Sequence, residues 1–268
     1  TLTDSLNTAR PFMDDLGAEQ LAKTLIGQEI AGWRLHSEIN HGKSAVVFRG
    51  DKGGIAAAVK VYSPEIIARF GADSQAKRIA RERALRGHGH PNLIETLDGG
   101  ECPRTHLFFT VMPLVECPTL SSLIATIPRP RIGPILMQVA SAAKFLEDRG
   151  FTHRDIKPDN IVVTPDFEHS VLLDLGVIRP NINSDITDTT SAKEFIATVR
   201  YSSPEYLVRE EGSNEAEAMQ GLTFYQLGGV LHDMIMRVPL FHDRSQPWPR
   251  LIRAVLYETP AVSASDVP

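Results

Sequence analysis

The polar residues with the clearest chemical meaning lie in two short stretches of the chain, FTHRDIKPDNIVV and SVLLDLG. Asp155, Lys157 and Asn160 share one loop, which we expect between a helix and a strand, and Asp174 follows the next apolar strand. Phosphoryl transfer needs a carboxylate to orient the attacking hydroxyl, hard oxygen ligands for a divalent metal, and a cation near the γ-phosphate. These four side chains supply each of those parts.

The segments before this loop predict a β-rich unit. WRLHSEI and AVVFRG flank the turn INHGKS, and GIAAAVKVY follows as a third strand. SPEIIARFGADSQAKRIARERALRG predicts a helix that is broken near Gly71, and HPNLIETLDGG and THLFFTVMPL predict two further strands. We therefore expect five mostly antiparallel strands with one main helix.

After Leu114 the pattern becomes helical. TLSSLIATI predicts a short helix, and GPILMQVASAAKFLEDRG a long amphipathic one. NIVVT and SVLLDLG predict two short strands, and GLTFYQLGGVLHDMIM another helix. The lead-in, residues 1–30, carries a helical stripe of Leu16, Leu21, Leu25 and Ile26, which we expect to pack on the main body or to bind a partner.

Bulk composition narrows the class of protein. The 268 residues suggest one two-lobed unit or two domains, and the net charge of −5 argues against a nucleic-acid partner. No apolar run is long enough for a membrane segment, and no signal-peptide core is present. Cys102 and Cys117 suit a reduced, cytoplasmic protein. Because the sequence lacks an initiator Met, we expect an excerpt or a processed product.

HRDIKPDN and DLG closely resemble the catalytic loop and the D-F-G element of eukaryotic-type (Hanks-type) serine/threonine protein kinases. The resemblance implies that Asp155 is the catalytic base, that Lys157 contacts the γ-phosphate, and that Asn160 and Asp174 bind Mg²⁺, or Mn²⁺ in its place. ATP would be the phosphate donor, and Ser/Thr hydroxyls of protein substrates the acceptors. Lys157 stands where tyrosine kinases usually carry another residue.

The resemblance also implies an α+β, bilobal fold. A small antiparallel β lobe with one main helix would span 31–113, after the extension 1–30. A larger, mostly helical lobe would span 114–268, without the last helices of the family.

The resemblance to this kinase family also implies which residues surround the phosphates of ATP. INHGKSAVVFRG lies where the family has G-x-G-x-x-G-x-V, with Gly42 kept and Asn40 and Ala45 at the other two glycine positions. Asn tolerates positive φ better than most residues, so Asn40 is a mild change. Lys60, in AAAVKVY, matches the lysine that contacts the α/β-phosphates and pairs with a helix glutamate. Glu82 is the candidate glutamate, although the usual spacing before HPN falls on Arg81.

The adenine site should lie at FFTVMPLVE. By resemblance Met112 is the gatekeeper, and the hinge runs from Pro113 to Val115. Pro113 keeps the carbonyl that this position offers, and Val115 would donate its N–H. Val47 and Ala58 would wall the ring.

ATVRYSSPEYL resembles the family segment G-T-x-x-Y-x-A-P-E. There Thr198 would bond to Asp155 and Lys157, and Glu205 would be structural. The preceding loop offers four candidate phosphorylation sites: Thr187, Thr189, Thr190 and Ser191. A phosphate there could pair with Arg154, so we expect autophosphorylation, with activation in trans by a second copy. The alternative is a merely solvated, Thr-rich loop.

Several positions depart from the family. Thr223 replaces a buried Asp that holds the catalytic-loop backbone, which predicts a weaker anchor, and Tyr225 replaces a Trp. Asn40, Ala45, Thr223 and the unusual spacing of Glu82 keep a second hypothesis open, a nucleotide-binding pseudokinase that acts as a scaffold or regulator. A small-molecule kinase and a non-kinase interaction module are the remaining alternatives.

Overall fold

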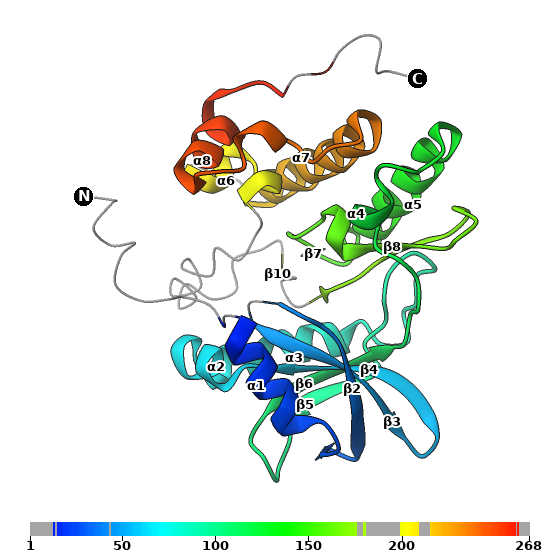
Figure 1. Ribbon diagram of the computed structural model, residues 1–268, viewed down its shortest axis with the longest axis vertical. Coiled ribbons are helices and arrows are strands. Elements are labelled where there is room, and N and C mark those ends of the chain that lie inside the picture. Colours follow the sequence, from blue (N-terminus) through cyan, green and yellow to red (C-terminus); the bar gives the residue numbers. More distant parts are fainter. Residues whose placement is uncertain are drawn as a thin grey trace. The chain divides into compact units, whose positions relative to one another are not determined.

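A computed structural model describes residues 13, 15–42, 44–175, 179–180, 199–208, 215–260 and 262. The chain divides into two compact units, Thr1–Arg86 with Glu95–Val115, and Gly87–Ile94 with Glu116–Pro268. Figure 1 shows the elements of each unit, which are described in turn.

In the part of the first unit that is described, six strands form one sheet in the order β1-β2-β3-β4-β6-β5, and each neighbouring pair is antiparallel. Alternating side chains give the sheet two faces. The strands are β1 (Glu29–Ile30), β2 (Trp33–His41), β3 (Ala45–Lys52), β4 (Ile55–Tyr62), β5 (Asp98–Glu101) and β6 (Phe108–Pro113). The prediction of a strand over HPNLIETLDGG is wrong for residues 90–97, where Leu93 makes only an isolated bridge to Leu172, and right from Asp98 on.

Helix α1 (Asp15–Leu25) packs on one face of this sheet. Its buried side chains Ala18, Ala22 and Leu25 belong to the same core cluster as apolar residues of β3 and β4. Packing of the lead-in helix on the main body is therefore confirmed. Of the predicted stripe, Leu25 is buried and Leu21 packs against the same cluster, whereas Leu16 and Ile26 are 62% and 43% exposed. The small side chains of Ala18 and Ala22 complete the packed face.

The predicted break near Gly71 is confirmed. Helix α2 (Pro64–Phe70) ends at Gly71, whose φ of +93° is favoured by glycine, and α3 (Ala72–Ala84) begins directly after it. On α3, Gln75, Ile79 and Glu82 are buried, at the spacing of one helical face.

The second unit is mostly helical, with two small two-stranded sheets among its described residues. Helices α5 and α7 pack against each other, and α5 also packs on β9. The elements are α4 (Leu120–Leu123), α5 (Arg129–Glu147), β7 (Phe151–Thr152), η2 (Pro158–Asn160), β8 (Ile161–Val163), β9 (Ser170–Leu172), β10 (Arg179–Pro180), η5 (Val199–Tyr201), α6 (Pro204–Val208), α7 (Glu215–Met236), η6 (His242–Arg244) and α8 (Trp248–Tyr257).

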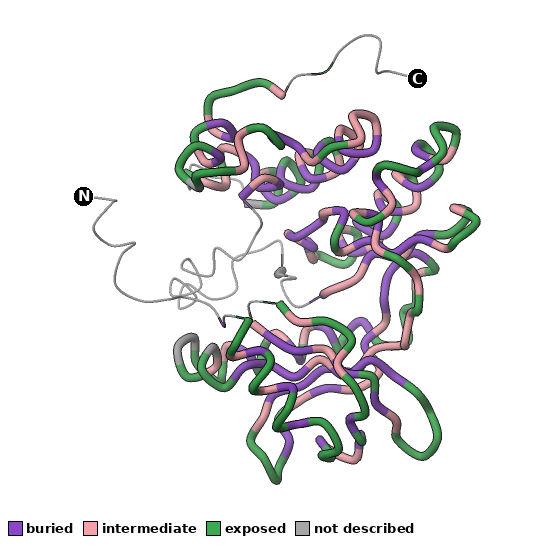
Figure 2. Tube along the Cα trace, viewed as in Figure 1, coloured by how far each residue is buried: buried purple, intermediate pink, exposed green. Residues whose placement is uncertain are grey.

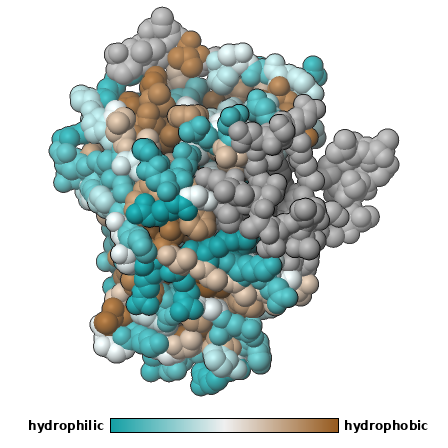
Figure 3. Space-filling model, turned by 180° about the vertical axis from the view of Figure 1, so that it is seen from behind, coloured by the Kyte–Doolittle hydropathy of each residue, from teal (hydrophilic) through white to brown (hydrophobic). Residues whose placement is uncertain are grey.

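Buried residues follow the strands and one face of each main helix, as Figure 2 shows. On the surface seen in Figure 3, hydrophilic and hydrophobic residues are interspersed. Among the described helices, none is long and apolar enough to cross a membrane. The α+β class expected from the sequence, a β-rich unit and a mostly helical unit, is confirmed.

Candidate active site

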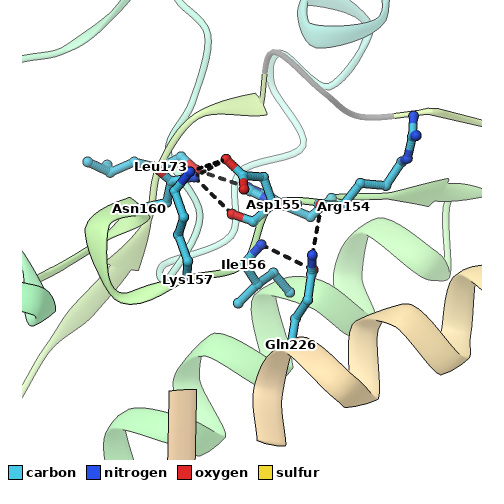
Figure 4. A network of polar contacts seen from close by, with 8 residues as sticks. Arg154, Asp155, Ile156, Lys157, Asn160, Leu173 and Gln226 are labelled. Carbon is cyan, nitrogen blue, oxygen red and sulfur yellow. Dashed lines mark hydrogen bonds and ion pairs between the residues drawn. The ribbon is translucent and has the colours of Figure 1, made fainter. Parts of the chain in front are cut away.

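Asp155 lies in the loop from His153 to Asn160, and hydrogen bonds to its main-chain groups fix its position. Asp155 donates its N–H to His153 Nδ1 at 3.3 Å, and its carbonyl accepts Asn160 Nδ2 at 2.8 Å. The next residue, Ile156, is fully buried and fixes the loop to the core of this unit. Figure 4 shows Asp155, Ile156 and Asn160 from close by.

The carboxylate of Asp155 lies between two donors of the same loop. Lys157 Nζ and Asn160 Nδ2 are each 2.8 Å from Oδ2 of Asp155. The side chains of Asp155 and Lys157 are 11% and 16% exposed, so the ion pair is largely shielded from solvent. The structure thus brings together three of the four residues with which the sequence argument began.

Asn160 also connects this loop to the segment that carries Asp174. Its carbonyl accepts the N–H of Leu173 at 2.7 Å, and the Leu173 carbonyl accepts Nε2–H of His153 at 2.9 Å. Asp174 comes next and has a φ of 61°, an uncommon value for a residue other than glycine. The peptide before Asp174 is therefore fixed by the same residues that hold Asp155.

His153 is 1% exposed and stays neutral. Burial lowers the pKa of its imidazole, although the carboxylates of Asp155 and Asp174 act in the opposite direction. Its two hydrogen bonds require one nitrogen to donate and the other to accept, which a neutral imidazole satisfies. The sequence argument gave this histidine no role of its own.

Thr223 does not anchor the catalytic loop. Its hydroxyl donates to the carbonyl of Met219 within α7, at 3.1 Å. One turn further along, Gln226 contacts the loop on both sides of Asp155. The loop is therefore held by Gln226, a residue that the sequence argument missed, and the weaker anchor expected from Thr223 stays a prediction.

In the first unit, the predicted phosphate loop is the turn between β2 and β3. Gly42 donates its N–H to the carbonyl of Ala45 at 2.9 Å, closing the turn. Asn40 has extended backbone and pairs with β3, so its tolerance of positive φ is not used. Its Oδ1 accepts the N–H of His41, and the hydrogen bond that the His41 imidazole donates to the Glu38 carboxylate raises the pKa of that imidazole.

Four of the residues predicted to surround ATP lie on one face of the sheet. Val47 pairs with Lys60 across β3 and β4, and Ala58 pairs with Met112 across β4 and β6. Directly paired residues and residues two apart share a face, so these four side chains lie together. The Nζ of Lys60 is 5.5 Å from the ring centroid of Tyr62, on the same face.

The predicted hinge comes directly after Met112 in the chain. Pro113 ends β6 and pairs with Ala57, and Val115 is the half-buried last residue of the first unit. Each keeps the backbone group expected of it, the carbonyl of Pro113 and the N–H of Val115.

Burial distinguishes the two candidates for the helix glutamate. Glu82 is 4% exposed and lies on the buried face of α3 with Ile79, whereas Arg81 is only half-buried. Ile79 shares a core cluster with Ala45 and Tyr62, which belong to the sheet face that carries Lys60. Helix α3 thus presents a buried carboxylate on the side of the sheet where Lys60 needs one.

Arg154, expected to receive a phosphate, donates to the hydroxyl of Tyr206 on α6. Glu205, the residue before Tyr206, is exposed. The pKa of Tyr225 is raised to about 12, mainly by burial and secondarily by the charge of Glu205. Thr198 and the four candidate phosphorylation sites lie outside the described residues.

The arrangement fits a metal–nucleotide site. Both hydrogen bonds of the Asn160 amide come from Nδ2, which turns Oδ1 away from Asp155 and leaves it as a ligand for a hard cation. Among the described residues, no group of three or more His, Cys, Asp or Glu could hold a metal unaided. A divalent ion held by few protein oxygens together with phosphate oxygens is the usual arrangement for Mg²⁺.

Comparison with known proteins agrees with this chemistry. The family model described as "Protein kinase domain" matches residues 33–259. The chain therefore belongs to the protein kinase family. The match includes the loop of Asp155, the strand of Lys60 and helix α7.

Named relatives are serine/threonine or sporulation protein kinases. Serine/threonine-protein kinase PknH of Mycobacterium bovis is 29% identical over 173 residues, covering 63% of this chain and 27% of the relative. Serine/threonine-protein kinase pkn2 of Myxococcus xanthus is 28% identical over 207 residues, covering 74% and 24%. Sporulation protein kinase mde3 of Schizosaccharomyces pombe is 30% identical over 169 residues, covering 59% and 28%. The chain spans about a quarter of the length of these relatives.

Proposed function

We propose that this chain is a serine/threonine protein kinase that transfers the γ-phosphate of MgATP to hydroxyl groups of protein substrates. The observation that carries the proposal is the hydrogen-bonded set of Asp155, Lys157 and Asn160. A pseudokinase is the second hypothesis, but every acidic, amide and lysine side chain needed for transfer is present in this chain.

In the proposed mechanism Asp155 orients the substrate hydroxyl and accepts its proton. Lys157 and Asn160 both contact Oδ2 of Asp155, so Oδ1 is the oxygen directed to the incoming hydroxyl. Lys157 stabilises negative charge that develops on the transferred phosphoryl group. Thr198 would add a hydrogen bond to this pair, as the family resemblance implies.

Asn160 and Asp174 would hold the metal, which lowers the charge of the phosphates when it is bound. Mg²⁺ suits their oxygen ligands, and Mn²⁺ would be accepted in its place. The main-chain bonds of Leu173 to Asn160 and His153 keep the residue before Asp174 in place.

The first unit would contribute the nucleotide contacts. Lys60 would bind the α/β-phosphates with Glu82 as its ion-pair partner, and Gly42 would lie in the loop over the phosphates. Adenine would contact the remaining predicted residues: Asn40, Ala45, Val47, Ala58, Met112, Pro113 and Val115. We propose that residues 31–113 form the small lobe and residues 114–268 the large lobe. Helix α1 belongs to the extension 1–30.

The proposal includes autophosphorylation of the Thr-rich segment in trans by a second copy. A rate per molecule that rises with protein concentration would support it, and a concentration-independent rate would contradict it. We also propose that the protein is cytoplasmic, because Cys102 and Cys117 are free thiols, as expected in a reducing compartment.

The decisive experiment compares phosphate transfer by the wild type and by Asp155→Asn, with a generic protein substrate and radiolabelled ATP. Removal of the base should lower kcat at least about 10²-fold. ATP should still raise the melting temperature of the variant in the presence of Mg²⁺, because the nucleotide contacts are kept. Chelation of the metal should abolish transfer by the wild type.

Asp166→Asn is the matched control. Asp166 is an exposed carboxylate in the turn after β8, bonded to Thr164 and to the N–H of Glu168. The same substitution there should leave kcat unchanged. Nucleotide binding by the wild type without transfer to any protein, including itself, would favour the pseudokinase.

A further inference from the structure

Gln226 makes two hydrogen bonds to the main chain of the catalytic loop. Its Oε1 accepts the N–H of Ile156 at 3.1 Å, and its Nε2 donates to the carbonyl of Arg154 at 2.8 Å. The residue is 1% exposed and lies within α7, from which Figure 4 shows it reaching the loop. The two peptide groups that it holds stand directly before and directly after Asp155.

These bonds complete the support of Asp155. Its own N–H is held by His153 and its own carbonyl by Asn160. With Gln226 on the flanking groups, all four main-chain polar groups next to the Asp155 Cα have a partner. The two dihedrals that set the direction of the Asp155 side chain are therefore fixed. The support matters because Arg154 has a φ of 70°, which a residue other than glycine adopts at a cost.

The chemistry of the contact selects an amide. The N–H of Ile156 needs an acceptor and the carbonyl of Arg154 needs a donor, and a glutamine side chain offers both. An ionised carboxylate would offer acceptors alone and would repel the Arg154 carbonyl. Thr223, three residues earlier on α7, uses its hydroxyl within the helix.

We propose that Gln226 is a positioning residue for phosphoryl transfer, which holds the peptide groups on both sides of Asp155 so that the carboxylate keeps its orientation toward the substrate hydroxyl. The inference rests on the proposed function of Asp155 as the catalytic base. Gln226 touches neither substrate nor metal and acts through the loop.

The first test is Gln226→Met, which keeps the length of the side chain and removes both hydrogen bonds. We expect kcat to fall about 10- to 100-fold, since small misplacements of a catalytic group cost rates of this order. KM for ATP should change by less than about threefold, because the lost interaction bears on the chemical step rather than on nucleotide binding. Melting curves with and without MgATP establish that the variant is folded.

The second test is Gln226→Glu, measured as the ratio of its kcat to that of the wild type across pH. Burial raises the pKa of such a carboxyl. Once protonated, it can donate to the Arg154 carbonyl and accept from Ile156, as the amide does. The ratio should therefore rise as pH falls, whereas the ratio for Gln226→Met should stay flat. Arg154, Asp155 and Lys157 are the charged groups of the facing loop. The flat ratio expected for Gln226→Met, which adds no charge, shows that their own titration does not produce the rise.

Thr223→Val is the matched control on the same helix, and its kcat should stay within about twofold of the wild type. Wild-type kcat in a folded Gln226→Met variant would overturn the inference while the proposed function stands. A flat ratio for Gln226→Glu would also overturn it, even if the Met variant failed to fold. Absence of transfer by the wild type would overturn the proposed function and this inference with it.

Discussion

Burial of a neutral His153 should make the folding stability of the second unit depend on pH. The folded imidazole has a lowered pKa, because of burial, while the unfolded one titrates near its ordinary value of about 6.5. Below that pH the unfolded chain takes up a proton that the folded chain does not. The free energy of unfolding therefore falls as pH falls, with a limiting slope of about 1.4 kcal/mol per pH unit.

A pair of substitutions isolates this effect. His153→Gln keeps a donor for the Leu173 carbonyl and an acceptor for the Asp155 N–H but does not titrate. Between about pH 7.5 and 5.5 the stability of the wild type should therefore drop relative to this variant by up to about 1.4 kcal/mol. His153→Leu removes both bonds and should lower stability at all pH values, by about 1 to 3 kcal/mol for each group left unsatisfied.

Urea unfolding followed by circular dichroism at a series of pH values measures these differences. Other histidines contribute to the slope of each protein, but their effect cancels when wild type and variant are compared. Equal slopes for the wild type and His153→Gln would refute the reasoning, because the folded imidazole would then bind its proton as readily as the unfolded one.

Two further predictions concern glycine and a buried tyrosine. A Cβ on Gly50 would lie 2.8 Å from the carbonyl oxygen of Arg34, whereas one on Gly42 would meet no atom within 4 Å. In thermal or urea unfolding, Gly50→Ala should lose about 1 to 3 kcal/mol and Gly42→Ala should change stability by less than about 1 kcal/mol; similar effects would contradict the packing of β3 against β2. Tyr201 donates to the fully buried Asp233, and burial together with that carboxylate raises the phenol pKa. Tyr201→Phe should cost about 1 to 3 kcal/mol, equally at pH 6 and pH 9, and a loss that vanished at pH 9 would mean that the phenol ionises.

The fold could be predicted well where local patterns are strong. The strands β3 and β4, the break at Gly71 and the apolar strands β8 and β9 follow from β-rich composition and turn chemistry. The packed face of helix α1 was predicted only in part, through Leu21 and Leu25, since Ala18 and Ala22 carry little hydrophobic signal although they are buried. Helix α8 was not predicted, although its buried residues Leu251, Ala254 and Val255 follow helical spacing.

The sequence predicted the residues of the candidate site, but not the residue that holds the main chain around Asp155. Asp155, Lys157 and Asn160 are close in sequence, so their convergence follows from one loop. Gln226 lies seventy residues from the loop group that it holds, and only the packing of α7 reveals the contact. Glu82 was assigned against the usual spacing, and its burial on α3 favours that assignment over Arg81.

Helix α1 has a practical consequence for work with this protein. The match to the kinase domain begins at residue 33, but Ala18, Ala22 and Leu25 cover apolar side chains of the sheet face opposite Lys60. A shortened chain cut at the family boundary would present apolar side chains of this cluster to water, and such a patch favours self-association. The unit that should be expressed and purified therefore starts upstream of α1, earlier than homology alone would place it.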